Sequence, residues 1–510
     1  MGLFKVLYIR KDLIEMEFTT LSKAVSKIID GSLITFSGME LNRAPMALVY
    51  EIARQGKKNL RTISIPNPLS SDVLIREGCV RHATFGFNGF SFEDGFVIAP
   101  NWKRAVENGL IEWKETDILE IVLALKAGSL GIKQIEVPQL KNTDYLKFNQ
   151  YKKIKKGGRE SVLAEAVRPD FALIHAQYCD LEGNVFIEDP LIDRLIASAS
   201  KKVIVSVEKI TKSVNCATIP KEKVDFIVHA KNGAMPTSCF GFYDYDLKGI
   251  RDYLMKSNAG KMGEKINFTK KLIFSKSTID NMIISMAEFI KDGTSVATGV
   301  ASPLPMIAVM FARKCGKNFD YFNCGSGAIN PVLKSPAYSS VTISALEQRQ
   351  SFMELTDVWE HALKGEIGTM FFGAVQIAGN GDVNITCIGD YKKPKVKLPG
   401  PAGAVTLRNL CKNAVIVTQH HTKKTFVEKV DFVTSSTNKD TTVITNLGAL
   451  KLGNKPEILY TYHDSSIEEV KANTGFELES GNAKIAKDIT ARDRGILSRI
   501  DSNSIRYKIL

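Results

Sequence analysis

The stretch that decides the fold is DGTSVATGVASPLPMIAVMFARKCGKNFDYFNCGSG, residues 292–327. It contains a short apolar strand pattern at 295–298, then a helical pattern that ends near Arg313, and a second short strand pattern before a loop of small residues. An earlier stretch, DGSLITFSGMELNRAPMALVYEIARQGKKN at residues 30–59, repeats these features in the same order. Similarity within one chain at this scale indicates duplication. Because two copies are too few for a solenoid, we predict two similar α/β halves that face each other.

The predicted fold class is therefore α/β, with two similar open α/β domains. A chain of 510 residues is long enough for two cores. The segment around 256–272 is rich in glycine and lysine and poor in apolar residues, which is typical of a linker. We predict an N-terminal extension at 1–17, a first domain at 18–255, that linker, and a second domain at 273–510.

Composition narrows the function classes. The hydrophobic fraction of 44% is ordinary for a globular protein, and no apolar run is long enough to span a membrane. The net charge of +13 comes from scattered lysines without interleaved aromatic residues, which argues against a nucleic-acid partner. Eight dispersed cysteines form no metal-binding pattern and fit free thiols in a reducing compartment. We expect a cytoplasmic protein with no metal.

Loops that follow predicted strands hold the candidate binding residues. Ligands of open α/β sheets bind at the carboxyl ends of strands, so Asn42 and Arg43 in the loop 37–45 are candidates for substrate binding. A loop cap and a solvated charge are the alternative reading of the same two residues. The segment 86–101, rich in glycine and aromatic residues, is predicted to be a long functional loop. His175 has no nucleophile beside it in sequence and is predicted to be structural.

The second half contributes two further loops. Small residues at 397–404 would let backbone N–H groups approach a ligand closely. His420, His421, Lys423 and Lys424 follow a predicted strand and could hold phosphate.

Several motifs together resemble the family I coenzyme A transferases, specifically the glutaconate CoA-transferase branch. The motifs NRAPM at 42–46, ALIHAQ at 172–177 and YDYD at 243–246 are similar to the α subunit of that branch. The motifs GDY at 389–391, LPG at 398–400, FVEKVD at 426–431 and NTGF at 473–476 are similar to its β subunit. The resemblance implies a fusion of the two subunits that acts on an acyl-CoA thioester, with coenzyme A as part of the substrate.

One departure from the family pattern limits what can be carried over. The resemblance implies a nucleophilic glutamate immediately before a Ser-Gly pair, and here Gly325 precedes Ser326 and Gly327. Glycine has no nucleophile, so acyl transfer through an enzyme carboxylate is not available at this position. Cys324 is a possible substitute, and a small buried thiol is the alternative reading of that residue.

The resemblance also implies an oxyanion-binding loop, which corresponds to Ala402, Gly403 and Ala404. Members of the family that lack the glutamate include steroid ring-opening hydrolases, which use an acid from the α subunit. Glu115 is most similar in position to that acid, and it would activate water or shuttle a proton. Alternatively, Glu115 is a carboxylate that stabilises a helix N-terminus.

The resulting prediction is a CoA-transferase family enzyme with Gly325 in place of the nucleophile. Its alternatives are an acyl-CoA C–C hydrolase that uses Glu115 and a non-catalytic acyl-CoA-binding protein. The predicted site comprises Glu115, Ala402, Gly403, Ala404, Gly325, Ser326, Asn42 and Arg43. The predicted partner is a small acyl-CoA, with no nucleic acid and no membrane, and a homodimer is possible.

Overall fold

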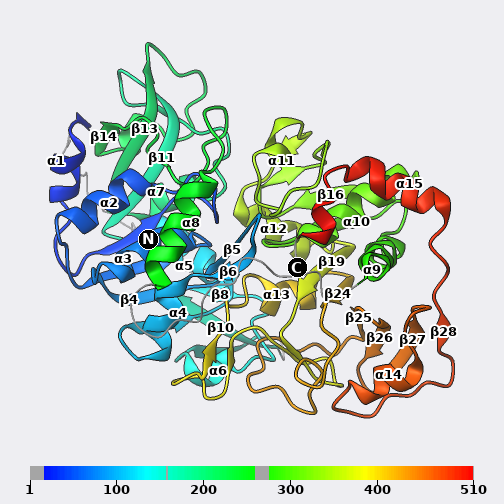
Figure 1. Ribbon diagram of the computed structural model, residues 1–510. Helices are drawn as coiled ribbons and strands as arrows, with labels where there is room; N and C mark the ends of the chain where they lie inside the picture. Colours follow the sequence, from blue (N-terminus) through cyan, green and yellow to red (C-terminus); the bar gives the residue numbers. More distant parts are fainter. Residues whose placement is uncertain (1–15, 157–158, 259–274, 509–510) are drawn as a thin grey trace, which may run out of the picture.

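A computed structural model describes residues 16–156, 159–258 and 275–508. The chain forms two halves side by side, each built on an open twisted sheet with helices packed against it (Figure 1). Blue to green elements form the first half, and green to red elements form the second. The predicted α/β class with two similar domains is confirmed.

The first half has a sheet with the strand order β1-β14-β13-β11-β2-β3-β4-β7, and β12 pairs with β11. Its pairings along this path are parallel. The strands are β1 (Glu17–Phe18), β2 (Leu33–Phe36), β3 (Leu60–Ser64), β4 (Val80–Phe85), β7 (Glu112–Glu115), β11 (Phe171–Asp180), β12 (Val185–Phe186), β13 (Lys202–Thr211) and β14 (Phe226–His229).

The second half has the strand order β18-β17-β16-β15-β19-β24-β25-β26-β27-β28. The central pairings are parallel, whereas both β17 pairings and the β25–β26–β27 meander are antiparallel. The strands are β15 (Ser295–Thr298), β16 (Asp320–Asn323), β17 (Ala328–Ile329), β18 (Ser351–Phe352), β19 (Thr369–Gly373), β24 (Asn413–Val417), β25 (Thr441–Ile444), β26 (Gly448–Leu452), β27 (Glu457–Thr461) and β28 (Lys484–Ile485).

The centres of the two sheets have the same topology. In the first half β2 lies between β3 and β11, and β13 and β14 follow. In the second half β15 lies between β16 and β19, and β24 and β25 follow. The first copy, 30–59, supplies β2 and α2 (Met46–Arg54) and leads directly into β3, and the second copy, 292–327, supplies β15, α10 (Pro303–Lys314) and β16.

Both connecting helices begin at a proline. Pro45 is the N-cap of α2, and Pro303 is the first residue of α10. A proline at the start of a helix loses no backbone hydrogen bond, so both positions are physically compatible with a helix N-terminus. Both helices bury an apolar face against their sheets.

The two halves share one hydrophobic core. Ile118 and Val122 of α5 (Ile118–Leu130) belong to the same buried cluster as Trp359 of α12 (Leu355–Leu363) and Leu407 of α13 (Ala404–Leu410). Asp117 caps α5 by accepting from the N–H of Leu119 at 2.9 Å, and its other carboxylate oxygen accepts from the N–H of Thr406 at 3.1 Å. Burial and hydrogen bonding across this boundary hold the halves in one arrangement.

The remaining helices surround these sheets. In the first half they are α1 (Leu21–Ser26), α3 (Pro68–Arg76), α4 (Pro100–Glu107), α6 (Tyr145–Phe148), α7 (Asp193–Ala199) and α8 (Leu247–Asn258). In the second half they are α9 (Lys276–Glu288), α11 (Ser344–Glu347), α14 (Ile467–Ala472) and α15 (Ala491–Ile500). None of the helices in the described ranges has the length and apolar character needed to cross a bilayer.

The predicted domain boundaries differ in detail from these elements. Strand β1 begins within the predicted N-terminal extension, and α8 continues three residues past the predicted boundary at 255. Most of the predicted linker lies in 259–274, outside the described residues, as do residues 1–15 of the extension.

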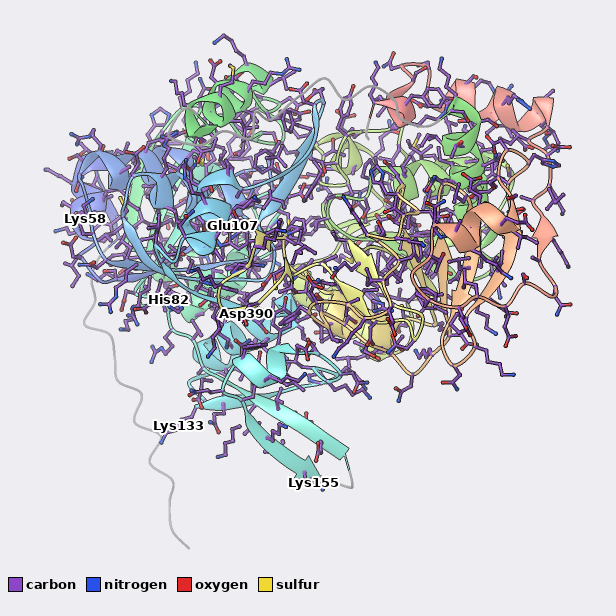
Figure 2. The ribbon with its side chains drawn as sticks, turned by 60° about the horizontal axis from the view of Figure 1, so that its bottom comes forward. Lys58, His82, Glu107, Lys133, Lys155 and Asp390 are labelled. Carbon is purple, nitrogen blue, oxygen red and sulfur yellow. The ribbon has the colours of Figure 1, made fainter. Side chains whose placement is uncertain are left out.

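Two segments outside the main sheets form hairpins. The basic stretch near 152–165 forms a hairpin of β9 (Lys152–Lys156) and β10 (Arg159–Glu165), and β10 also pairs with β8 (Gln134–Val137). Figure 2 shows Lys155 near the tip of this hairpin, away from the body of the protein. The aromatic segment expected as a long loop forms the hairpin of β5 (Gly89–Phe92) and β6 (Gly95–Ile98).

Candidate active site

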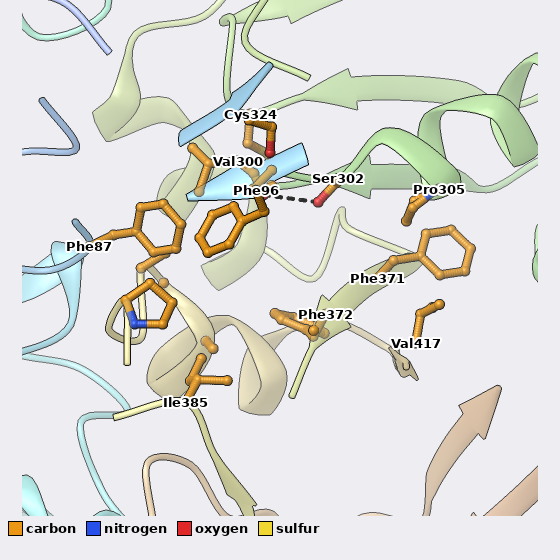
Figure 3. Close-up of a pocket in the computed structure, with 18 of the residues that line it drawn as sticks. Phe87, Phe96, Val300, Ser302, Pro305, Cys324, Phe371, Phe372, Ile385 and Val417 are labelled. Carbon is orange, nitrogen blue, oxygen red and sulfur yellow. Dashed lines mark hydrogen bonds between the residues drawn. The ribbon is translucent and has the colours of Figure 1, made fainter. Parts of the chain in front are cut away.

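A cavity of about 490 Å³ lies between the two halves. Figure 3 shows Phe87 and Phe96 of the first half facing Val300, Phe372 and Ile385 of the second. The β5–β6 hairpin therefore contributes to the wall, which supports a functional role for the segment expected as a loop. The volume is within the range of about 300–1,000 Å³ that is typical of small-molecule sites.

The lining of the cavity is mainly apolar. None of the described residues that line it is an aspartate, glutamate, lysine or arginine. Its polar side chains are those of Ser91, Ser302, Cys324, Tyr338, Thr418, Gln419 and His420. Carboxyl, ammonium and guanidinium groups of the described chain could therefore act on a bound molecule only from behind this wall.

The loop after β16 is the one predicted to stand where the family has its nucleophile. Cys324 lines the cavity. At Gly325, an added Cβ atom would lie 2.9 Å from Val341 Cγ2 and 3.3 Å from Ser340 Oγ, which is too close for a comfortable contact. Ser326 is directed into its own loop, where its N–H donates to Asn323 Oδ1 at 3.3 Å. Among these predicted residues, the cavity lining includes Cys324 but neither Gly325 nor Ser326.

Cys324 has the surroundings of a structural thiol. Burial raises the pKa of the Cys324 thiol to about 12, so the thiolate is scarce at neutral pH. The Sγ atom lies 3.8 Å from the carbonyl oxygen of Phe322, a weak contact to a neutral acceptor. His361 stacks on Phe322 with ring centroids 4.9 Å apart, but its Nδ1 atom contacts Glu366 Oε2. The thiol is therefore not activated as a nucleophile.

The predicted oxyanion loop lines the cavity, but two of its three N–H groups are occupied. The N–H of Ala402 donates to the carbonyl of Gly86 at 2.8 Å, and the N–H of Ala404 donates to the carbonyl of Pro401 at 2.8 Å. The N–H of Gly403 has no acceptor within the described chain. Ala402 has a φ of 49°, a left-handed conformation that a side chain disfavours and that is common at functional sites.

Glu115 lies directly behind this loop. It is fully buried at the end of β7, and its Oε2 atom accepts a hydrogen bond from Lys397 Nζ at 2.7 Å. Oε1 has no hydrogen-bond partner among the described residues. A Cβ atom added to Gly400 would lie 2.5 Å from Oε1, and Gly400 lines the cavity. The Glu115 carboxylate therefore packs against the backbone of Gly400, a residue of the cavity wall.

The environment of Glu115 gives it acid–base character. Burial raises its pKa to about 7, although the Lys397 ammonium opposes the shift. Burial also lowers the pKa of Lys397, whose Nζ also donates to the carbonyls of Thr386 and Leu398. The alternative of a helix N-terminal carboxylate is wrong for Glu115, because Asp117 occupies the N-cap of α5.

A second buried carboxyl group, Glu40, is absent from the predicted site. It follows β2, is 1% exposed, and has a φ of 46°. Its Oε2 atom accepts from Ser339 Oγ of the second half at 2.8 Å. Burial raises its pKa to about 8, opposed by Ser339 and by the N–H groups of Ser91 and Ala301. Ser91 and Ala301 line the cavity, so Glu40 lies behind a second part of the wall.

Asn42 and Arg43 lie in the same loop but do not line the cavity. Arg43 is 1% exposed and forms ion pairs with Asp189 at 2.9 Å and Asp193 at 2.6 Å. Asn42 donates to Asp189 Oδ2 at 2.7 Å and accepts from Ser238 Oγ at 3.0 Å. Arg43 is thus not the solvated charge of the alternative reading. The geometry favours a structural role for both, and their substrate-binding role stays a prediction.

His175 belongs to a buried polar cluster that the sequence pattern does not reveal. Its Nδ1 and Nε2 atoms contact Ser206 Oγ and Glu208 Oε1, each at 2.8 Å. With Cys239 these groups could in principle surround a metal ion. However, Glu208 also accepts from the N–H groups of Asn232 at 2.8 Å and Gly233 at 3.0 Å. The nitrogen and oxygen donor atoms are already engaged, so the cluster fits a structural network better than a metal site.

The two adjacent histidines of the second half differ. His420 lines the cavity, next to the exposed Lys423 and Lys424. His421 is buried, contacts Thr445 and Thr474 at 3.0 and 2.9 Å, and has a pKa lowered by burial to about 3. His421 is thus a neutral core residue, and a phosphate-binding role stays a prediction for the other three.

Comparison with known proteins resolves the family. The model of the family described as "Coenzyme A transferase" matches residues 18–230 and 279–473, one region in each half. The chain belongs to this family. It is a CoA-transferase family enzyme in which both family regions are present in one chain.

Two curated relatives and one solved structure are similar to this chain. One 3-oxoadipate CoA-transferase subunit from Pseudomonas knackmussii is 30% identical over 242 residues, which are 45% of this chain and 84% of that protein. The cholesterol ring-cleaving hydrolase IpdA subunit of Rhodococcus jostii is 27% identical over 253 residues, 46% of this chain and 84% of that protein. An acyl-CoA transferase apoenzyme from Escherichia coli O157:H7 has the same fold, with a TM-score of 0.73 and 15% identity over 93% of this chain and 96% of that chain.

Proposed function

We propose that this enzyme processes an acyl-CoA thioester in the cavity between its halves without forming a glutamyl intermediate at residue 325. The single observation that carries the proposal is the packing at Gly325. Even a Cβ atom there would press against Val341 at 2.9 Å, so the site is packed around a glycine. The route through an enzyme-bound glutamyl thioester requires a carboxylate that reaches the substrate carbonyl.

Proton transfer by Glu115 is the chemistry that the remaining groups favour. A carboxyl group with a pKa of about 7 can both accept and donate a proton near neutral pH. In the proposed reaction water adds to a ketone carbonyl of the acyl group while Glu115 accepts its proton. The adjacent C–C bond then breaks, the carbon accepts the electron pair, and Glu115 returns the proton to that carbon.

Charge that develops on oxygen needs a donor inside the cavity. The N–H of Gly403 is unoccupied within the described chain and belongs to the cavity wall, so we assign it as the oxyanion donor. Of the predicted loop, Ala402 and Ala404 instead hold the loop in shape through their own hydrogen bonds. Hydrolysis of a C–C bond is also the reaction class in the name of the ring-cleaving hydrolase among the relatives, which supports the proposal.

CoA transfer is the second candidate function, because Cys324 lines the cavity and its thiol is chemically able to accept an acyl group. The motifs at 42–46 and 398–400 are similar to those of the glutaconate CoA-transferase branch, which favours CoA transfer. A pKa of about 12 for the thiol counts against efficient transfer.

Product analysis distinguishes these functions. The purified protein is incubated with a panel of acyl-CoAs, including 3-oxoacyl and cyclic 1,3-dicarbonyl thioesters, in heavy-oxygen water, with and without acetate. Heavy oxygen in a shortened or ring-opened acyl product supports hydrolysis. CoA recovered on acetate contradicts the proposal and supports transfer. Binding of acyl-CoA without turnover supports the third reading, a non-catalytic acyl-CoA-binding protein.

A further inference from the structure

We propose that the acyl group accepted by this enzyme is uncharged and bulky, branched or ring-bearing, and that acyl groups with a terminal carboxylate are excluded. The inference rests on the proposed function, since it concerns the acyl part of the same thioester. It is drawn from the side chains that form the cavity wall and from the charges immediately behind that wall.

The wall is formed by large apolar side chains from both halves. Phe87 and Phe96 come from the first half, with ring centroids 6.0 Å apart. Trp359, Phe372 and Ile385 face them from the second half. Figure 3 shows Phe87, Phe96 and Phe372 around the same part of the cavity. A branched or cyclic acyl group would bury more apolar surface here than a short linear one.

The cavity has no counter-charge for a second carboxylate. None of its described lining residues is a lysine or arginine, and the one histidine among them, His420, belongs to the part assigned below to coenzyme A. The buried ammonium group of Lys397 donates its hydrogen bonds to Glu115 and to two backbone carbonyls. The guanidinium of Arg43 is likewise held by Asp189 and Asp193. A carboxylate in the cavity would therefore be buried without a partner, which is strongly unfavourable.

Charges behind the wall would make that situation worse. Glu40 and Glu115 lie against different parts of the wall. An ionised Glu40, whose described side-chain partner is the hydroxyl of Ser339, would repel an acyl carboxylate across a medium of low dielectric constant, whereas the charge of an ionised Glu115 is balanced by Lys397. The cavity thus selects against negative charge mainly through the absence of lysine and arginine among the described wall residues, and Glu40 adds to this selection as it ionises at alkaline pH.

Three consecutive polar lining residues, 418–420, follow β24. Thr418 and His420 line the cavity just before the exposed Lys423 and Lys424. This part of the cavity can accommodate the polar, phosphate-bearing part of coenzyme A near solvent. The aromatic end, which includes Phe87 and Phe96, remains for the acyl group.

The test compares thioesters that differ only in the terminal group. Dissociation constants of the full-length protein are measured by calorimetry for hexanoyl-CoA and adipyl-CoA, and for the bulkier cyclohexanecarbonyl-CoA. We expect adipyl-CoA to bind at least about 30-fold more weakly than hexanoyl-CoA, and cyclohexanecarbonyl-CoA to bind most tightly. Equal or tighter binding of adipyl-CoA would overturn the inference but leave the proposed function standing. If none of the thioesters binds, the proposed function itself fails.

A charge added to the wall sharpens the test. Phe96 is 44% exposed, so Phe96→Arg should fold. The ratio of the dissociation constants of adipyl-CoA and hexanoyl-CoA should be at least tenfold smaller in this variant than in the unchanged protein. The matched control is Phe18→Arg, because Phe18 is 40% exposed, lies on β1 and is outside the cavity. This variant should leave the ratio of the two dissociation constants unchanged. An unchanged ratio in Phe96→Arg would overturn the assignment of the aromatic end to the acyl group.

Discussion

Glu40 and Glu115 are two buried carboxyl groups of the first half that flank one cavity, and they differ in their partners. Glu115 has an ammonium partner, Lys397, at 2.7 Å. Glu40 has a hydroxyl partner, Ser339, at 2.8 Å. Both have raised pKa values, but only Glu115 can be stabilised as an anion by a neighbouring cation.

The difference in partners indicates which carboxyl group can alternate between its charged and neutral forms. Glu115 can lose its proton at neutral pH because Lys397 remains beside it, and burial makes it a strong enough base to accept one. Glu40, with a pKa of about 8, is mainly protonated at pH 7 and joins the halves as a neutral acid through Ser339. We therefore assign proton transfer to Glu115 and a positioning role to Glu40.

The largest expected effect is on catalysis by Glu115→Gln. The amide cannot take a proton from water, so kcat should fall by about 10²–10⁴-fold. Binding of a non-reactive acyl-CoA should change little, because the amide keeps the size of the side chain. Steady-state kinetics with the substrate found by product analysis measures the loss. Glu112→Gln, on the same strand and 64% exposed, is the control and should keep full activity. Full activity of Glu115→Gln would contradict the assignment of proton transfer to Glu115 rather than to Glu40.

The next effect is on stability, in Lys397→Met. Removing one partner of a buried ion pair leaves an uncompensated charge, which costs about 3–5 kcal/mol. The loss should grow as pH rises. Without Lys397 the native pKa of Glu115 is raised further above its unfolded value of 4.5, so the native state binds more protons and loses stability with increasing pH. Urea unfolding at pH 6 and pH 9 measures this difference.

Lys395→Met is the matched control for that experiment, since Lys395 is exposed on the same segment. It should leave the free energy of unfolding within about 0.5 kcal/mol of the unchanged protein. A Lys397→Met protein as stable as this control at both pH values would contradict the ion pair.

A further effect on stability is expected from Glu40→Gln, and it should grow as pH rises from about 4.5 to 8. The native pKa of about 8 lies above the unfolded value of 4.5, so Glu40 lowers the stability progressively as pH rises from about 4.5 to 8. Glutamine does not titrate, so Glu40→Gln should be more stable than the unchanged protein at pH 9 and similar to it near pH 5. Thermal unfolding against pH tests this, with the exposed Glu77→Gln as control. A kcat loss as large as that of Glu115→Gln would show that Glu40 also transfers protons.

The smallest effect is expected at Gly325, the glycine that we propose stands in place of the family nucleophile. In Gly325→Ala the new methyl group meets Val341 at 2.9 Å, and overpacking of this kind costs about 1–3 kcal/mol. The double variant Gly325→Ala/Val341→Ala should recover part of that loss. Chemical denaturation of the two variants measures the recovery, and no destabilisation by Gly325→Ala would show that the site has room for a side chain.

The duplicated stretch is enough to predict the architecture. Strand and helix patterns repeat at 30–59 and 292–327, and the two sheets have the same central order. Local patterns specify such elements because side-chain periodicity reflects burial. The hairpin at 89–98 escapes prediction because its glycines and aromatic residues are also typical of a loop.

The site is only partly predictable. Glu115 and the loop 402–404 are found through family motifs, but the partner of Glu115 lies 282 residues away in sequence. Glu40 offers no pattern, since its carboxyl group becomes buried only when Ser339 of the second half packs against it. Arg43 is expected at a ligand because strand-end loops often bind one, yet Asp189 and Asp193 neutralise it. Contacts between distant segments decide these roles, and one sequence does not display them.

The most direct test of the account is a search for a covalent intermediate during turnover. The protein is mixed with an excess of its acyl-CoA substrate, quenched in acid within one turnover, and examined by intact-protein and peptide mass spectrometry. We predict that the mass of the protein stays unchanged while heavy oxygen from the solvent enters the product. A protein species heavier by coenzyme A or by the acyl group, mapped to Cys324 or to any carboxylate, would contradict the account.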